Sequence, residues 1–300
     1  MKQLTVISGK GGTGKTTLTA SFAASVKGII IADADVSAPD LHLLLRPQIL
    51  QSEEFMGAKV AVIDKDTCNQ CGECEKSCRF KAIKNIEIDT LLCEGCGVCA
   101  YICPQEAIAI QDQLTGHVYI SETRFGPLAY ANLCAGAEAS GKLVTRVREV
   151  ARKLCQGKSS GLIMIDGSPG IGCPVIASIT GVDLALIVTE PTLSGLADLE
   201  RVVHLTEHFH IKALVCINKY DINLKNTQKI CEFCQENKVG FVGMIPFDEE
   251  VNRALNLGRP VVEVSHGPTA RAIRKVWETV LQYLGLGEEK GIESLHEKEA

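Results

Sequence analysis

Short apolar runs alternate with longer amphipathic stretches along most of this chain. The apolar runs at 4–8, 29–32, 161–166, 184–189, 211–218 and 241–245 have the length and composition of buried parallel strands. Helical periodicity occupies 15–26, 142–155, 194–209, 226–236 and 268–284. This alternation predicts an α/β fold built on a doubly wound parallel sheet with right-handed crossovers.

The segment 59–112 interrupts that rhythm with an internal repeat. Seven residues, Cys68, Cys71, Gly72, Cys74, Cys78, Ala82 and Ile83, recur 25 positions later as Cys93, Cys96, Gly97, Cys99, Cys103, Ala107 and Ile108. A short duplicated unit inside an α/β chain predicts an inserted small domain at 59–112. The larger domain would then comprise 1–58 and 113–286, followed by a charged and frayed tail at 287–300.

Charge and composition favour a cytoplasmic protein that contacts neither nucleic acid nor membrane. The 300-residue chain is 46% hydrophobic and has a net charge of -5, so it lacks the overall basic footprint of a nucleic-acid binder. Its N-terminus has no signal-peptide pattern, and apolar runs such as 28–32 are too short to span a bilayer. The tail carries five acidic residues and two lysines, a balance that disfavours an anionic membrane.

The fourteen cysteines are concentrated in one region, because eight of them fall between residues 68 and 103. Nothing in the sequence signals export, and clustered cysteines in a reducing compartment more often bind metal than form disulfides. The cysteine content therefore indicates a local metal site.

A phosphate-binding loop follows the first predicted strand. The sequence Gly9-Lys10-Gly11-Gly12-Thr13-Gly14-Lys15-Thr16, followed by Thr17, matches G-x-x-x-x-G-K-[ST]. Its glycines let backbone N–H groups surround the phosphates, Lys15 reaches the outer phosphates, and the Thr16 hydroxyl can bind Mg²⁺. A strand before the motif and a helix after it supply the context that this function requires.

The second lysine of the loop, Lys10, makes the motif more specific. The pattern G-K-G-G-x-G-K-T-T resembles the loop of the MinD/Mrp/nitrogenase-iron-protein superfamily of P-loop ATPases, over about 1–57 and 113–284. The resemblance implies slow Mg²⁺-dependent ATP hydrolysis by a homodimer, in which Lys10 reaches the partner's nucleotide. The alternative is a solvated loop lysine.

Two acidic segments resemble the switches of that superfamily. In Asp33-Ala34-Asp35, the resemblance assigns the attacking water to Asp35, whereas Asp33 could equally be a turn or capping residue. In the segment 166–172, Asp166 at a strand end would hold Mg²⁺, and the Gly170 backbone could sense the γ-phosphate. A simple βα turn is the alternative for this second segment.

The base-binding residues are expected farther along the chain. Asn218 lies where the superfamily places its base-reading asparagine, and Pro246 lies in a segment similar to its adenine-side wall. Read literally, Asn218-Lys219-Tyr220-Asp221 is also N-K-x-D, in which Asp221 would pair with guanine. ATP is favoured by the resemblance, GTP stays open, and an ordinary turn is the third possibility.

The eight clustered cysteines form two runs of C-x2-C-x2-C-x3-C, the spacing of bacterial ferredoxins. Zinc ribbons and free thiols are the alternatives. Resemblance to two-cluster ferredoxins implies that the fourth cysteine of each run crosses over to the other 4Fe-4S cluster. Cluster 1 would take Cys68, Cys71, Cys74 and Cys103, and cluster 2 would take Cys78, Cys93, Cys96 and Cys99. Arg79 follows Cys78 at the position where the family has proline. This change would affect the potential or the exposure of the cluster that Cys78 binds, or would provide a docking contact.

Six cysteines lie outside the two runs: Cys134, Cys155, Cys173, Cys216, Cys231 and Cys234. Most are expected to be small core residues. The pair Cys231 and Cys234 resembles the C-x-x-C with which Mrp-type carriers share a bridging cluster. Its spacing also fits the buried face of a helix, which we favour.

Three functions follow from these features. ATP-driven dimer closure could gate electron transfer from the clusters to a partner protein, which is the favoured hypothesis because both ligand sets are complete. The chain could instead assemble or carry iron–sulfur or molybdenum clusters. A partitioning role of the MinD/ParA type is the third, although it gives the clusters no purpose.

Overall fold

The computed structural model describes residues 1–137, 140–156 and 161–286. Within this part of the chain, nine strands form one sheet in the order β11-β10-β9-β1-β8-β2-β7-β6-β3, and β4 pairs with β5 separately. The strands are β1 (Lys2–Ser8), β2 (Ile30–Asp33), β3 (Gln48–Ile63), β4 (Ile83–Lys84), β5 (Glu87–Ile88), β6 (Ile108–Thr123), β7 (Gly126–Leu133), β8 (Leu162–Pro169), β9 (Leu184–Thr189), β10 (Ala213–Asn218) and β11 (Gly240–Ile245). The helices are α1 (Lys15–Ala23), α2 (Leu41–Leu45), α3 (Glu73–Ser77), α4 (Val98–Ile102), α5 (Ser140–Cys155), α6 (Cys173–Ile179), α7 (Leu193–His208), η1 (Tyr220–Ile222), α8 (Leu224–Glu236), α9 (Glu249–Asn256), α10 (Val261–Val264) and α11 (Pro268–Leu284).

The α/β prediction is confirmed, with one correction at the sheet edge. Neighbouring strands from β11 to β7 run parallel, whereas β6 and β3 are antiparallel. The sheet is therefore dominated by parallel strands rather than wholly parallel. The first helix ends at Ala23 and not at 26, because a turn through Ala24 and Ser25 closes it.

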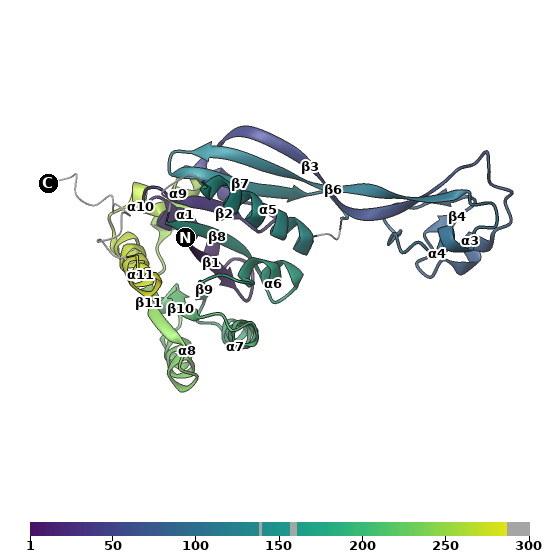
Figure 1. Cartoon of the computed structure of the whole chain (residues 1–300). Coiled ribbons are helices and arrows are strands. Elements are labelled where there is room, and N and C mark those ends of the chain that lie inside the picture. Colours follow the sequence, from purple (N-terminus) through teal and green to yellow (C-terminus); the bar gives the residue numbers. More distant parts are fainter. Residues whose placement is uncertain (138–139, 157–160, 287–300) are drawn as a thin grey trace.

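Helices cover both faces of the sheet (Figure 1). One core cluster joins the sheet to α1, α2, α9, α10 and α11, and it includes Phe22 stacked on Trp277 at 4.9 Å. On the other face, one cluster packs under α5 and another under α6, α7 and α8. This three-layer body presents the carboxyl ends of its parallel strands at one edge, where ligands bind in open α/β sheets.

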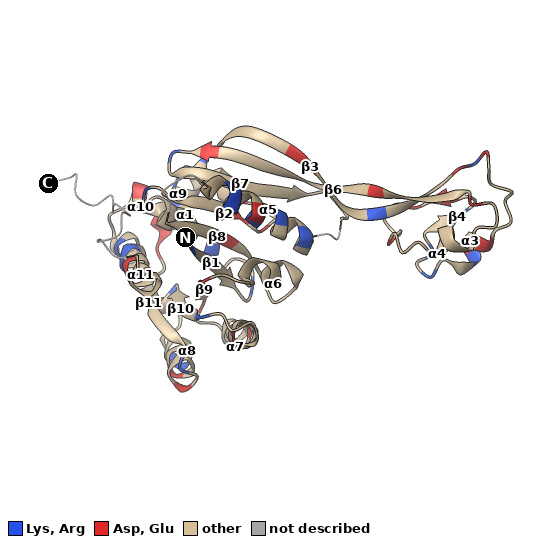
Figure 2. Ribbon diagram, in the orientation of Figure 1, with Lys and Arg blue, Asp and Glu red and all other residues tan. Residues whose placement is uncertain are grey.

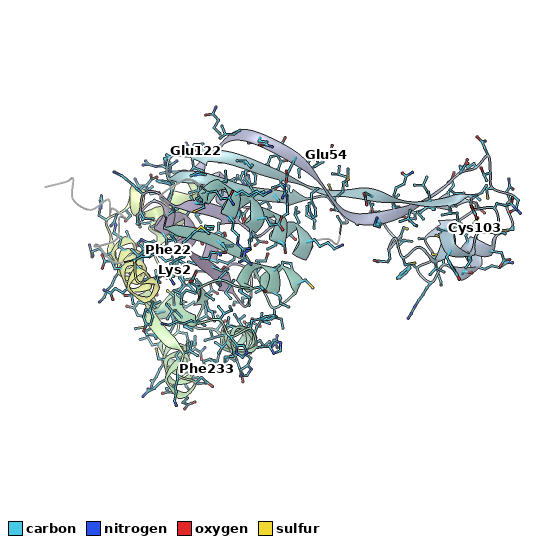
Figure 3. All side chains as sticks on the ribbon, in the orientation of Figure 1. Lys2, Phe22, Glu54, Cys103, Glu122 and Phe233 are labelled. Atoms are coloured by element: carbon cyan, nitrogen blue, oxygen red, sulfur yellow. The ribbon has the colours of Figure 1, made fainter. Side chains whose placement is uncertain are left out.

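A long two-stranded arm, β3 and β6, leaves the edge of the body and ends in a small lobe of residues 64–107 (Figure 1). Its strands pair from Gln48 and Glu122 to Ile63 and Ile108, and sixteen extended residues span about 50 Å. Figure 3 shows Glu54 on the body half of the arm and Cys103 in the lobe. The expected boundaries at 58/59 and 112/113 therefore fall within the arm.

The 25-residue repeat of the sequence is also a repeat of the lobe's backbone. Gly72 and Gly97 begin α3 and α4 at φ 74° and 80°, a left-handed conformation that glycine adopts without strain. Lys81 and Glu106 are left-handed at φ 54° and 52°. Equivalent turns thus follow the last cysteine of each run.

The expected tail at 287–300 lies outside the described residues. Within the described part, no helix is both long and apolar enough to cross a membrane.

Candidate nucleotide and metal-cluster sites

The phosphate-binding loop joins β1 to α1 at the carboxyl edge of the sheet, as expected. Gly14 begins α1 at φ 90°, and a Cβ there would collide with the Asn218 side chain. Gly9 is packed so closely against Asp198 of α7 that it also has no room for a Cβ. Packing therefore requires glycine at these two positions, in addition to the role that the sequence predicts for them in surrounding the phosphates.

Lys15 lies at the centre of a buried charge cluster. Its Nζ is 3.1 Å from Asp166 Oδ1 and 3.7 Å from Asp35 Oδ2, and the side chain is 7% exposed. Burial lowers the pKa of Lys15, but the neighbouring carboxylates, Asp166 first, raise it by more, so the net pKa lies above its ordinary value. Lys15 is therefore held as a cation beside two acids.

Asp166 has the free oxygen that a magnesium site would need. Its Oδ1 accepts hydrogen bonds from Lys15 Nζ and from Thr19 Oγ1 at 3.2 Å, whereas its buried Oδ2 has no hydrogen-bond partner among the described residues. A buried carboxylate oxygen without a partner is costly. A water molecule on Mg²⁺ would satisfy it, so Asp166 fits the role predicted for it.

Asp33 and Asp35 differ in environment. Asp33 is fully buried and accepts hydrogen bonds from the Asp35 and Leu41 backbone N–H groups at 3.0 and 3.1 Å. Burial and the nearby Asp166 carboxylate raise the pKa of Asp33 well above its ordinary value. These two hydrogen bonds agree with the turn or capping role that the sequence left open for Asp33. The Asp35 side chain, by contrast, reaches the cavity described next; burial is also the main cause that raises its pKa.

A cavity of about 720 Å³ lies against the phosphate-binding loop. It is lined by residues 11–17 of the loop, by Asp35, Ser37, Ala38 and Asp40 after β2, by Ser8 and Pro169, by Leu43 and Leu44 of α2 and by Leu255 of α9. The loop residues offer backbone N–H groups and Lys15, and Leu43, Leu44 and Leu255 offer apolar side chains. This pairing suits a molecule with a phosphate tail and a flat apolar base.

The expected base-reading residues make contacts within the chain instead of lining this cavity. The Asn218 amide donates to the Thr13 carbonyl at 2.8 Å, and Asp221 accepts the Phe247 N–H at 2.7 Å. The Pro246 carbonyl accepts the Thr269 hydroxyl at 3.4 Å. Asn218 therefore supports the phosphate-binding loop, and base reading by these residues stays a prediction.

The second switch segment contacts both the loop and the first switch. The Gly170 N–H, predicted to sense the γ-phosphate, donates to the Ser8 carbonyl at 2.8 Å. The Ser168 hydroxyl donates to the Ala34 carbonyl at 2.8 Å. The two switches are thus joined directly, and Gly170 would have to exchange its Ser8 contact for a phosphate.

Lys10 contacts residues of its own chain at the start of α7. Its Nζ is 3.1 Å from Thr192 Oγ1, 3.4 Å from Ser194 Oγ and 3.4 Å from Glu190 Oε2. Glu190 also binds Lys219 Nζ at 2.5 Å, and Lys219 in turn reaches the Gly12 carbonyl. Sequence reasoning missed Glu190, although its place at the carboxyl end of β9 could have indicated it.

If Lys10 acts across a dimer, as the sequence resemblance implies, replacing Glu190 with glutamine should release Lys10 for that role. We expect the protein concentration for half-maximal ATP hydrolysis to fall about fivefold, because a partly exposed ion pair contributes ~1 kcal/mol. Titration of the ATPase rate against protein concentration measures this. Glu200→Gln, an exposed change on α7, is the control. An unchanged or higher half-maximal concentration would contradict the role given to Glu190.

The lobe arranges its eight repeat cysteines around two cavities. One, of about 170 Å³, is lined by Cys68, Cys71, Cys74 and Cys103. The other, of about 200 Å³, is lined by Cys78, Cys93, Cys96 and Cys99. Each cavity thus takes three cysteines from one run and the last cysteine of the other run, as the resemblance to two-cluster ferredoxins implied.

Each cavity is bordered by four thiols, the kind of donor that iron–sulfur clusters take. No three His, Cys, Asp or Glu side chains among the described residues lie close enough together to hold one metal ion, which needs ligands at about 2.3 Å or less. Backbone N–H groups donate to three of the sulfurs: Ala82 to Cys78 and Ala107 to Cys103 at 3.3 Å, and Ala61 to Cys93 at 3.5 Å. Such hydrogen bonds stabilise thiolate ligands.

The two cavities lie at different positions along the arm. Ile108, at the tip of β6, lines the first cavity, whereas Ala61 of β3, inward from the tip, lines the second.

The side chains that follow Cys78 also border the second cavity: they are Arg79 and Phe80. Arg79 therefore lies beside the cavity that contains Cys78, and its effect on potential, exposure or docking stays a prediction. Figure 2 shows that acidic and basic residues are interspersed over the lobe and the body.

Cys231 and Cys234 lie on α8, as the core interpretation requires. Cys234 is 2% exposed and belongs to the core under α7 and α8, and Cys231 packs against that core. Burial raises the pKa of Cys234 to about 11. Cys155 and Cys216 are also buried, as expected for most of these cysteines, whereas Cys134 is partly exposed and Cys173 is exposed.

Alkylation should distinguish the buried thiols from the exposed ones. At pH 8, Cys234 should react with iodoacetamide at least about 100-fold more slowly than Cys173, because its thiol is buried and its pKa is raised to about 11. Peptide mass spectrometry over time gives both rates. Comparable rates would show that the α8 pair is accessible.

Comparison with known proteins supports the nucleotide site. The sequence model of the CobQ/CobB/MinD/ParA nucleotide binding domain matches residues 4–261. An uncharacterized protein of Methanocaldococcus jannaschii is 31% identical, over 94% of this chain and 97% of that protein. An iron-sulfur cluster carrier protein of Pyrococcus horikoshii is 26% identical, over 48% of this chain and 53% of the carrier.

Solved structures agree on the fold. The septum site-determining protein MinD of Pyrococcus horikoshii, complexed with Mg-ADP, superposes with a TM-score of 0.56 at 19% identity, covering 93% of this chain and 95% of that one. A family match across most of the chain, together with the loop and cavity described above, leads to one assignment. The chain belongs to the CobQ/CobB/MinD/ParA family of nucleotide-binding proteins.

Proposed function

We propose that the chain is a dimeric, Mg²⁺-dependent ATPase whose nucleotide state controls electron transfer through two 4Fe-4S clusters to a partner protein. One observation carries this proposal: two cavities in the lobe are each bordered by four cysteines, with one cysteine exchanged between the runs. When bound there, the clusters would supply one-electron transfer.

The nucleotide half of the proposal assigns a task to each charged residue. Lys15 binds the outer phosphates, and Thr16 and Asp166 hold Mg²⁺. Asp35 reaches the cavity and orients the attacking water. Closure of two subunits would draw Lys10 away from Glu190 toward the partner's nucleotide. The MinD relative solved with Mg-ADP supports the choice of adenine nucleotide and Mg²⁺.

A metallocluster carrier is the second candidate, favoured by the relative named as an iron-sulfur cluster carrier. A carrier must release its cargo, which calls for accessible or shared ligands. In this chain both ligand sets are complete within one lobe, and Cys234 of the α8 pair is buried. Retained redox clusters therefore agree better with the geometry than a transferable one.

The two candidates predict opposite results with one sample. The anaerobically reduced protein would be mixed with an oxidised one-electron acceptor, and separately with an apo-ferredoxin, each with MgATP or MgADP. Electron transfer requires acceptor reduction that depends on ATP, with the iron retained on this chain. ATP-dependent movement of iron to the apo-ferredoxin would instead establish a carrier.

A further inference from the structure

The point where the arm leaves the body carries two of the three register shifts of the β3–β6 hairpin. Its pairing runs Phe55 to Gly116, Met56 to Leu114 and Ala58 to Gln113. Gly57 of β3 and Thr115 of β6 are thereby left out of the ladder, one extra residue on each strand. Bulges of this kind bend a strand and increase its twist.

The side chain of Thr115 links the two extra residues by hydrogen bonds. The Thr115 hydroxyl accepts the Gly57 N–H at 3.0 Å and donates to the Phe55 carbonyl at 3.1 Å. Thr115 is 1% exposed, so these bonds have no competing water. We call the residues Phe55, Gly57 and Thr115 the arm joint.

The carbonyls freed by the bulges bind the body. The Thr115 carbonyl accepts the Cys134 N–H at 2.8 Å, and the neighbouring Leu133 N–H donates to the Val36 carbonyl at 2.9 Å. Val36 follows Asp35 directly. A hydrogen-bonded path therefore leads from the first switch, through the end of β7, to the arm joint.

The second switch reaches the same joint through α5. Cys173, just after the 166–172 segment, lies so close to Gly141 that a Cβ on the glycine would be 3.2 Å from the Cys173 Cβ. The next residue of α5, Lys142, donates from Nζ to the Gly57 carbonyl at 3.0 Å. Gly57 and Thr115 are thus each held by one switch path.

Beyond the joint, the arm holds the nearer cluster cavity. Gly95 has no room for a Cβ because it packs against the Lys59 backbone, and the Ala61 N–H donates to Cys93 Sγ at 3.5 Å. Lys59 and Ala61 lie two and four residues past Gly57. A change of twist at the joint would therefore move Cys93 and its cavity (Figure 1).

We propose that the arm joint is the device that transmits the nucleotide state to the lobe, with Thr115 and Lys142 as positioning residues. This inference rests on the proposed ATP-dependent switch and names how that switch would act on the clusters. ATP binding would reorder the two switch segments. The change would pass through the end of β7 to Thr115, and through α5 and Lys142 to Gly57, and would alter the twist of the arm. Neither positioning residue lines the nucleotide cavity.

Hydrogen exchange on the full-length holoprotein tests the joint. In wild type, exchange rates of peptides covering 52–58 and 112–118 should differ about tenfold between MgATP and MgADP, because the joint is opened or tightened locally. Lys142→Met should reduce that difference to less than about twofold. Lys153→Met, an exposed lysine on the same helix, should leave it unchanged. Thr115→Val should behave as Lys142→Met does.

Equal exchange in the two nucleotides in wild type would overturn the proposal, as would a full difference in both Lys142→Met and Thr115→Val. Nucleotide binding and acceptor reduction, measured on the same samples, separate this inference from the proposed function. ATP-dependent electron transfer that persists undiminished in both variants would reject the joint alone. A responsive joint without ATP-dependent electron transfer would reject the proposed function and leave the joint supported.

Discussion

Replacement of Lys15 with alanine is expected to lower the rate of ATP hydrolysis at least about 100- to 1000-fold, the usual cost of removing a donor that stabilises developing charge. The loss should appear in kcat as well as in KM, because the proposed role of Lys15 is to contact the outer phosphates throughout the reaction. Lys229→Ala, on the exposed surface of α8, is the control. Hydrolysis within about tenfold of wild type would contradict the site.

The same variant should lose stability in a pH-dependent way. Lys15 is the cation nearest to the buried Asp166, and its removal should cost about 3 kcal/mol because a buried carboxylate loses its partner. Lys15 also lowers the pKa of Asp33, which burial and Asp166 raise well above 3.8. A carboxyl with a raised folded-state pKa favours the fold below the unfolded pKa and loses that contribution as pH rises through the folded pKa.

Without Lys15 the pKa of Asp33 should rise further, so the stability deficit should grow from acid toward neutral pH. Denaturant unfolding of both proteins at several pH values measures this difference. A deficit that is equal at all pH values would show that Lys15 does not neutralise the buried acids.

Replacement of Cys103 with serine is expected to remove cluster 1 and leave cluster 2, although Cys103 belongs to the second sequence run. Iron content should fall from about eight to about four atoms per chain, because each 4Fe-4S cluster needs four thiolates. The reason is the exchange of cysteines between cavities: Cys103 borders the cavity of Cys68, Cys71 and Cys74. Iron analysis with EPR of the reduced protein measures the loss.

The matched control is the equivalent residue of the other run, Cys78. Cys103→Ser should give the EPR spectrum of Cys68→Ser, and Cys78→Ser should give that of Cys93→Ser. If Cys103→Ser instead matched Cys96→Ser, each run would bind its own cluster and the assignment would be wrong.

The elements that carry the phosphate-binding loop and the cysteine runs could be predicted because their signals are local. An apolar run before 9–14 and periodicity after it define β1 and α1, and the 25-residue repeat defines the lobe's two equivalent turns. The arm could not be predicted in this way. Most β3 side chains between 48 and 59 are at least partly exposed, so its strand is held by pairing with β6 and has little apolar alternation.

Contacts between distant segments also could not be predicted from the sequence. Lys10 was predicted to act across a dimer, but its contact with Glu190, 180 positions away, depends on how β9 and α7 lie beside the loop. Asn218 was expected at a base and is bonded to Thr13 of the loop. Lys10 and Asn218 both lie at the carboxyl edge of the sheet, as the predicted strands require. Their contacts with Glu190 and Thr13 depend on tertiary packing, which the sequence pattern does not show.

The most direct test of coupling between nucleotide and clusters is EPR of the reduced holoprotein with MgATP and with MgADP, recorded with the molar mass of the same samples. We expect two 4Fe-4S signals per chain, a dimer with MgATP, and a change in line shape on going from MgADP to MgATP. A protein that has the same mass and an identical spectrum with either nucleotide would contradict that coupling.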